Sequence, residues 1–326
     1  MIDLGGWLAK PEIIENETRA IKKLCSGCHP NIVEVLRIGE LKDSPYYFID
    51  MELCDINLQD YIYRDDSKTL PDAIPYFIKD ASSQVKALQI WNIIQQIASG
   101  VAFIHSHHET HRDIKPQNSN SSFLFPFPSC AVRVGILISI VLFSRKDSEW
   151  KIADFGLTSE GGSKTFLTSQ LGRGTESYRA PELVTQKEYN NMVDIWAIGC
   201  ILYELATFKK AFSNDFEVYE YSKGQISFEV VIDGFDETSA TSMEELILRI
   251  LKVEPKDRPS AGDLVTEFRK LAEAEFPSNI SHVQIYQDFQ TIDSRISTLT
   301  TLASDFQGSS VIGPVNEQVL CLSRPP

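Results

Sequence analysis

The stretch from Thr110 to Asn118 reads T-H-R-D-I-K-P-Q-N. It brings the carboxylate of Asp113, the ammonium of Lys115 and the amide of Asn118 into one short, turn-forming segment. Phosphoryl transfer needs these three kinds of group to converge, because a hydroxyl must be oriented while phosphate and metal charges are balanced. Taken alone, such a stretch also fits ordinary surface polarity, so the order of the motifs that follow it decides the interpretation.

Four further landmarks follow this stretch in order. A short alternating run, W-K-I-A, predicts a strand that delivers Asp154 to a loop. The landmarks are D-F-G at 154–156, A-P-E at 180–182, D-I-W-A-I-G at 194–199, which opens an apolar helix, and P-K-D-R-P at 255–259. Each one by itself is an ordinary helix start or a surface charge. Together, five landmarks in one order are hard to obtain by accident.

At these residues the chain resembles the eukaryotic-type Ser/Thr protein kinases, whose catalytic loop is H-R-D-x-x-x-x-N. The resemblance implies an α+β, two-lobed fold with an incomplete N-terminal β lobe and a mainly helical C-terminal lobe. The implied domains are a partial N-lobe at 1–54 with one helix and two strands, a C-lobe at 55–274 with an insertion at 119–140, and a tail at 275–326.

The resemblance implies transfer of the ATP γ-phosphate to a Ser or Thr hydroxyl of a protein substrate. Asp113 would accept the hydroxyl proton and Lys115 would neutralise the phosphate. Asn118 and Asp154 would hold Mg²⁺. Thr175 resembles the Thr that hydrogen-bonds the catalytic Asp and Lys, and this favours Ser and Thr over Tyr as acceptors.

Other positions of the family's pattern are supporting ones. The resemblance implies that Asp194 braces the catalytic loop and that Arg258 pairs with Glu182 of A-P-E. The remaining supporting positions are His111, Arg112, Phe155 and Gly156.

The run M-E-L-C-D at 51–55 resembles the hinge between kinase lobes. There the backbone of Glu52 and Cys54 would bind adenine, and Met51 would be the gatekeeper. In the Gly-, Ser- and Thr-rich segment before A-P-E, a phosphate could pair with Arg112 and order the loop. The candidate phosphosites are Thr165, Thr168 and Ser169, and the alternative is that they are plain loop hydroxyls.

The beginning of the chain lacks two family features, the Gly-rich strand pair and the strand-borne Lys that contacts phosphate. We interpret Met1–Lys10 as a foreign or truncated start. Helical spacing predicts a helix over Ile14–Leu24 that carries Glu17. Glu17 is either the family's ion-pairing Glu, whose Lys partner cannot be named, or a solvated helix carboxylate.

Apolar periodicity predicts the remaining elements. Two strands are predicted at 32–41 and 46–53, joined by a hairpin turn at 42–45, and residues 61–86 are predicted as a surface excursion. Helices are predicted at 85–105, 194–208, 243–252 and 261–274.

Residues 119–140 form an apolar, proline-bearing piece where the family runs directly into a strand. Removing it on paper joins Asn118 to Val141, which restores the run N-V-L-F. We therefore hypothesise a retained intron or a similar in-frame insertion. A membrane span is the competing idea, but the uninterrupted apolar run at 134–143 is about half of the ~20 residues that a spanning helix needs.

The formal net charge of −14 disfavours nucleic acid and anionic membranes as partners and permits basic peptide substrates. Met1–Lys10 has no basic region followed by an apolar run, so no secretory signal and an intracellular location, cytoplasmic or nuclear, are expected. The six cysteines then read as thiols. Cys25–His29 spells the C-x-x-C-H of haem attachment, which the missing export signal disfavours; a bridge or metal site across its two cysteines stays open.

A heptad-like pattern of apolar residues runs from Ile285 to Phe306. It favours a short helix docking on its own domain, and self-association through 285–306 is the alternative. The missing Gly-rich strands and Lys leave a rival function open, a catalytically impaired kinase-like binding or scaffold module.

Overall fold

The computed structural model describes residues 11–25, 29–40, 47–63, 82–116, 118–121, 136–161, 167–168 and 174–275. All of these belong to a compact unit spanning Met1–Ser278, and Asn279–Pro326 forms a second unit. Several predictions therefore lie outside the described residues. They concern the start at 1–10, Cys28, the turn at 42–45, most of the excursion at 61–86, residues 122–135 of the insertion, Thr165, Ser169 and the segment 285–306.

The N-terminal part of the unit contains helix α1 (Pro11–Leu24) and an antiparallel pair of strands, β1 (Val35–Glu40) and β2 (Tyr47–Met51). Helical spacing places Ala20, Ile21 and Leu24 on one buried face of α1. The predicted helix and strand pair are confirmed. The first strand begins later than predicted, because Ile32 instead makes an isolated parallel bridge to Ile152.

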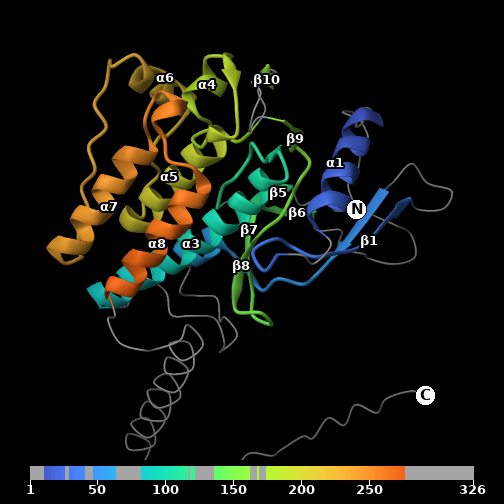
Figure 1. Cartoon of the computed structure of the whole chain (residues 1–326), viewed down its shortest axis with the longest axis horizontal. Coiled ribbons are helices and arrows are strands. Elements are labelled where there is room, and N and C mark those ends of the chain that lie inside the picture. The colour runs from blue at the N-terminus through green and yellow to red at the C-terminus, as the bar shows by residue number, and fades with distance from the viewer. Residues whose placement is uncertain are drawn as a thin grey trace, which may run out of the picture. The chain divides into compact units, whose positions relative to one another are not determined.

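The C-terminal part is mainly helical, and Figure 1 shows α3, α5, α7 and α8 gathered on the side of the unit away from α1 and β1. Helix α3 (Ser83–Ser106) packs against α8 (Ala261–Glu275), where the Trp91 and Phe268 rings stack with centroids 6.1 Å apart. Among the described helices, α3 alone is long and apolar enough to cross a membrane, and 67% of that apolar window is buried inside the domain. Its apolar character is therefore that of a core helix.

Helix α5 (Met192–Thr207) lies in the middle of the helical part, so it is apolar on all sides. It packs against α7 (Glu237–Ile250) at Gly199, where a Cβ atom would come within 2.7 Å of Ile250 Cγ2. The predicted start of α7 at residue 243 is wrong. The helix begins six residues earlier because the Asp236 side chain accepts a hydrogen bond from the Ser239 N–H and caps it.

Short elements connect the two parts and carry the site. A three-stranded antiparallel sheet has the order β3-β7-β8, and β4 pairs with β9 as β10 does with β11. The strands are β3 (Ile56–Asn57), β4 (Glu109–Thr110), β7 (Val141–Ser144), β8 (Glu149–Ile152), β9 (Ser159–Glu160), β10 (Leu167–Thr168) and β11 (Glu188–Tyr189). The short helices are α2 (Leu58–Ile62), α4 (Pro181–Val184), α6 (Asp215–Ser222) and the 3-10 turn η2 (Pro255–Asp257).

The predicted insertion begins and ends as an antiparallel pair, β5 (Asn118–Ser121) and β6 (Ile136–Ser139). Their register puts Asn118 opposite Ser139, so the chain leaves the fold and returns to it at one place. Ile140 is buried directly after the pair, and β7 follows it. Strand β7 therefore starts two residues after the pair ends at Ser139, and the insertion itself stays a hypothesis.

Candidate active site

The loop after β4 is held by a buried carboxylate from α5. Asp194 accepts hydrogen bonds from the backbone N–H groups of His111 (2.9 Å) and Arg112 (2.8 Å), and His105 Nε2 lies 2.9 Å from the same carboxylate. Burial alone would raise the pKa of Asp194, but these hydrogen bonds and the two nearby histidines outweigh burial and lower it. The bracing role that the resemblance implies for Asp194 is thus present as geometry.

Three of the sequence-predicted residues meet in one cluster after this brace. Thr175 Oγ1 donates to Asp113 Oδ1 at 2.6 Å, and Lys115 Nζ donates to Asp113 Oδ2 at 2.9 Å. Lys115 Nζ also contacts Thr175 Oγ1, which closes the triangle. Lys115 is buried, so its ammonium group stays beside the carboxylate instead of extending into solvent. The arrangement presents one oriented carboxylate and one cation at the same point.

The D-F-G residues lie against this loop. Phe155 packs its ring edge-on to His111, with centroids 5.5 Å apart, and His111 Nε2 lies 3.1 Å from the Ala153 carbonyl oxygen. Asp154 has φ +63°, a left-handed conformation that is uncommon for residues other than glycine. Its carboxylate accepts a hydrogen bond from the Gly156 N–H at 3.2 Å.

Burial raises the pKa of the Asp154 carboxyl, and the nearby Asp113 raises it further, against the lowering effect of His111, Gly156 and Lys115. An anion in this position therefore gains from a cation beside it. Carboxylate oxygen is a hard donor that suits Mg²⁺, so the described donor fits the metal that the family uses. Asn118 begins β5, but its side chain lies outside what the structure describes.

Glu17 projects from α1 toward the D-F-G turn. Its carboxylate carbon lies 3.8 Å from the position that a Cβ on Gly156 would take. Burial, assisted by the charge of Asp154, raises the pKa of Glu17 to about 7. This partial burial disfavours the interpretation as a solvated helix carboxylate. Within the described ranges Glu17 also has no ion-pair or hydrogen-bond partner, so the ion-pairing interpretation finds no cation there.

The hinge-like run is anchored to β1 and β8. The Glu52 N–H donates to the Glu34 carbonyl at 2.9 Å, and both Glu52 carboxylate oxygens accept hydrogen bonds from Lys151 Nζ at 2.9 Å. Burial is the main cause that raises the pKa of Cys54 to about 12, so its thiol stays protonated. Met51 ends β2 and is 40% exposed. The adenine-binding and gatekeeper roles of this run stay predictions.

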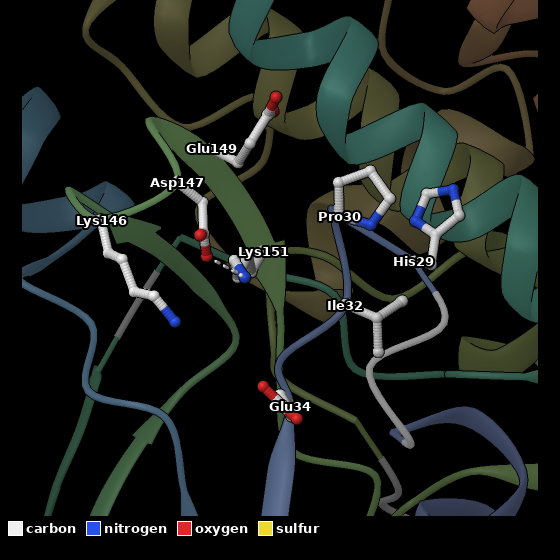
Figure 2. A pocket seen from close by; sticks show the side chains of 8 residues that line it. All are labelled: His29, Pro30, Ile32, Glu34, Lys146, Asp147, Glu149 and Lys151. Carbon is white, nitrogen blue, oxygen red and sulfur yellow. Dashed lines mark ion pairs between the residues drawn. The ribbon is translucent and has the colours of Figure 1, made fainter.

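Lys151 also faces a hollow of about 480 Å³ at the turn between β7 and β8. Figure 2 shows its ammonium paired with Asp147, whose Oδ2 lies 2.7 Å away. Burial alone would lower the pKa of Lys151, but Asp147 and Glu52 together raise it. The lining residues are His29, Pro30, Ile32, Glu34, Lys146, Asp147, Glu149 and Lys151. We had assigned no role to Lys151, which lies three residues before Asp154 in the chain.

Arg258 and Glu182 form a buried, bidentate ion pair, with N···O distances of 2.7 and 2.9 Å. The Arg258 guanidinium also donates to the Met192, Lys252 and Val253 carbonyls and lies 5.1 Å from the Trp196 ring centroid. The pairing implied by the resemblance is therefore confirmed. It ties α4 to η2 and to the start of α5.

The side chain of Arg112, the expected partner of a loop phosphate, contacts protein groups of the residue after D-F-G and of β11. Its Nε donates to the Leu157 carbonyl at 2.5 Å and its Nη1 donates to the Tyr189 hydroxyl at 2.9 Å. Among the candidate phosphosites, only the backbone of Thr168 falls within the described part of the chain, where it pairs with Glu188 in β10 and β11. The phosphosites stay predictions.

Two buried carboxylates near the site were missed from the sequence. Glu204 of α5 accepts hydrogen bonds from the hydroxyls of Tyr63 (2.7 Å) and Tyr178 (2.6 Å), and burial raises its pKa. One acid inside the apolar run I-G-C-I-L-Y-E-L-A was its only signal. Glu109 of β4 is fully buried and contacts two basic residues of α1. No local pattern marks it, because its partners lie far away in the sequence.

Comparisons with known proteins point to one family. A family model described as the protein kinase domain matches residues 8–268. Among curated relatives, human serine/threonine-protein kinase Nek5 is 28% identical over 80% of this chain and 31% of its own length. The serine/threonine-protein kinase H1 homolog of Danio rerio is 28% identical, covering 77% of this chain and 50% of the relative. Calcium/calmodulin-dependent protein kinase type 1 of Macrobrachium nipponense is 29% identical, covering 79% and 62%.

The chain thus spans about a third to two thirds of the length of these relatives. The family match extends over most of the chain and includes the helix α1, the catalytic loop, the D-F-G turn and the Glu182–Arg258 pair. It confirms the resemblance drawn from motif order and the α+β, two-lobed fold class. This chain belongs to the protein kinase domain family.

Proposed function

We propose that the chain is a Ser/Thr protein kinase, which transfers the ATP γ-phosphate to Ser or Thr hydroxyls of protein substrates with Mg²⁺ bound. The observation that carries the proposal is the triangle of Asp113, Lys115 and Thr175. The names of the relatives described above support the Ser/Thr assignment. We further propose an intracellular location, protein substrates rather than nucleic acid, and no membrane attachment.

In this proposal Asp113 orients the acceptor hydroxyl and takes its proton. Thr175 donates a hydrogen bond to Asp113 Oδ1, so the orientation of the Asp113 carboxylate is fixed before the substrate arrives. Lys115 stands beside the other carboxylate oxygen and neutralises charge on the transferring phosphate. Asp194 keeps the loop in place by holding its backbone.

When bound, Mg²⁺ would supply positive charge that balances the negative charge of the ATP phosphates. Asp154 would hold the metal, with the Asn118 amide as its proposed companion. The backbone of Glu52 and Cys54 would bind adenine. A supporting role is proposed for Glu17, which lies beside the D-F-G turn. A supporting role is also proposed for Arg112, which would form an ion pair with a phosphate group on Thr165, Thr168 or Ser169.

The test compares wild-type protein with Asp113→Asn in transfer of labelled γ-phosphate from Mg·ATP to a mixture of Ser-, Thr- and Tyr-containing peptides. Losing a general base costs on the order of 10²–10⁴-fold in rate, and we expect the variant to lose that much. Arg249→Ala is a matched control, because it removes an exposed ion pair with Glu267 on the far helices. We expect it to keep wild-type transfer to Ser and Thr, with little to Tyr.

Equal transfer by wild type and Asp113→Asn would contradict the proposed role of Asp113. Transfer absent in both would favour the rival function, a catalytically impaired binding or scaffold module. In that case calorimetry with and without Mg²⁺ measures whether the wild type binds nucleotide. The result distinguishes a module that binds nucleotide from one that does not. Self-association through 285–306 can be measured on the same protein by sedimentation.

A further inference from the structure

Helix α1 is tied to the C-terminal part by a buried cluster around Glu109. Glu109 belongs to β4, two residues before His111, and its side chain has no solvent exposure. Arg19 of α1 binds it with both terminal guanidinium nitrogens: Nη1 donates to Oε1, and Nη2 donates to Oε2 at 3.0 Å. Lys23 Nζ lies 2.9 Å from Oε1. One carboxylate therefore receives two cations from successive turns of α1.

The ion pairs of Glu109 with Arg19 and Lys23 connect α1 strongly to β4. Burial alone would raise the pKa of Glu109, but hydrogen bonds from Arg19 and Lys23 outweigh burial and lower it, so the carboxylate is ionised in the folded protein. The same hydrogen bond raises the pKa of Arg19. Removing Arg19 would leave the buried Glu109 carboxylate with Lys23 as its remaining cation, which is more costly than losing a pair at the surface.

The cluster also reaches the segment that follows D-F-G. Asn16 of α1 donates from Nδ2 to the Thr158 carbonyl at 2.6 Å, and its Oδ1 accepts from Arg19 Nη2 at 3.1 Å. Strand β9 pairs with β4, which puts Glu160 opposite Glu109, and Glu160 lies 3.9 Å from Arg19. Through Arg19 and Asn16, α1 thus touches both the strand that enters the catalytic loop and the strand that leaves the D-F-G turn.

Glu17 shows why this connection matters for the site. It lies on α1 between Asn16 and Arg19 and reaches the Gly156 turn, yet within the described ranges no cation binds it. In the family a Lys–Glu ion pair contributes to the placement of this helix. Here the described polar contacts of this helix are made with Glu109 of β4, with Glu160 of β9 and with the Thr158 carbonyl.

We propose that Arg19 and Glu109 are positioning residues, which hold α1 against the β4–β9 pair so that Glu17 stays beside the D-F-G turn in the active arrangement. The inference rests on the proposed kinase function. Arg19 and Glu109 act through the helix and the loop, not by touching substrate. Lys23 supports the pair from the next turn of α1.

The test uses the full chain as Arg19→Ala, Arg19→Lys and Glu109→Gln, with Arg249→Ala as the control for loss of an arginine ion pair. Each protein is measured for thermal unfolding, for kcat and ATP KM, and for amide hydrogen exchange in α1, α3 and α5. We expect Arg19→Ala and Glu109→Gln to speed exchange in α1 by about tenfold or more with α3 and α5 unchanged. Because misplacement of about 1 Å can cost on the order of 10²-fold in rate, we expect kcat to fall at least about tenfold.

Arg19→Lys keeps the charge and should recover part of kcat and of the protection of α1, while Arg249→Ala should match wild type. Faster exchange in α1 with unchanged kcat would show a purely structural contact and overturn the proposal. Unchanged exchange in α1 would overturn it as well. If Glu109→Gln does not fold, Arg19→Ala decides, since Arg19 is 32% exposed. If wild type transfers no phosphate, the kinase proposal fails by that measurement, while exchange in α1 still decides whether the cluster holds the helix.

Discussion

Burial of the Glu17 carboxyl group disfavours its ionised form and so raises its pKa. Its pKa is about 7 in the folded protein and near 4.5 when unfolded. The folded state therefore keeps a proton that the unfolded state has already released between these values. Stability from this group is greatest below pH 4.5, falls as the pH rises toward 7, and then stays constant. The difference corresponds to a cost on the order of 3 kcal/mol above pH 7.

Glu17→Gln should remove this cost. We expect it to raise the free energy of unfolding by up to about 3 kcal/mol at pH 8 and by about 1 kcal/mol at pH 5. Urea unfolding in EDTA without nucleotide measures both values. Glu15→Gln, an exposed acid on the same helix, is the matched control and should change neither. An equal increment at the two pH values would show that desolvation of the charge is not the cause.

Sequence reasoning was most accurate for side chains whose partners are fixed by a short loop. Asp113 and Lys115 are two residues apart, so their contact follows from local geometry, and the family's pattern supplied Thr175. It was least accurate for Glu17 and Glu109. Arg19 and Glu109 are 90 residues apart, and nothing in either neighbourhood indicates that the two will be buried together. Desolvation depends on tertiary packing, so no local pattern could show that Glu17 loses its solvent.

At the scale of elements, apolar periodicity predicted α1, α3, α5 and α8 to within a few residues. It missed the first turns of α7, which have no large apolar residue and are stabilised by a cap at Asp236. It also missed the short helices α2 and α6. The two-residue strands were missed because they depend on pairing with distant segments. The break at residue 119 was visible because an apolar piece interrupts a known motif order.

The insertion is the element whose removal gives a direct test. Because Asn118 and Ser139 are paired at its base, joining Asn118 to Val141 leaves the β3-β7-β8 sheet with its own contacts. We expect deletion of residues 119–140 to leave the protein folded, with the midpoint of thermal unfolding lowered mainly by loss of the buried Ile140. Phosphate transfer should be equal or higher. A deletion variant that is unfolded by circular dichroism would show that the insertion is part of the core. Sequencing of spliced transcripts tests the intron hypothesis separately.

The Glu182–Arg258 pair connects α4, α5 and η2, so its loss should weaken the helical part as a whole. Arg258→Met leaves Glu182 buried without its cation and should lower the free energy of unfolding by about 3–5 kcal/mol. Urea unfolding measures the loss. Arg249→Ala, at an exposed pair, should lower it by less than about 1 kcal/mol. Similar losses in both variants would mean that the buried pair adds nothing beyond a surface contact.

For the molecule as a whole, the order of five motifs was enough to predict the fold class, because those motifs lie in connected parts of one site. The arrangement of α1 was beyond such reasoning. It depends on ion pairs between residues of α1 and β4 and on a hydrogen bond from Asn16 to Thr158, none of which has a sequence signature of its own. Motif order therefore predicts which groups meet, and packing determines how firmly they are held.

The net charge of −14 leads to a prediction about substrates. A negative field attracts cationic peptides and raises their encounter rate, whether or not a specific pocket reads their sequence. At low ionic strength we expect a Ser peptide flanked by Lys and Arg to have a higher kcat/KM than the same peptide flanked by Asp and Glu. The advantage should shrink as added salt shortens the screening length from about 30 Å at 0.01 M to about 10 Å at 0.1 M. A Gln-flanked peptide is the uncharged control, and its kcat/KM should change little. An advantage that salt leaves unchanged would contradict long-range attraction and indicate a short-range contact with the basic residues.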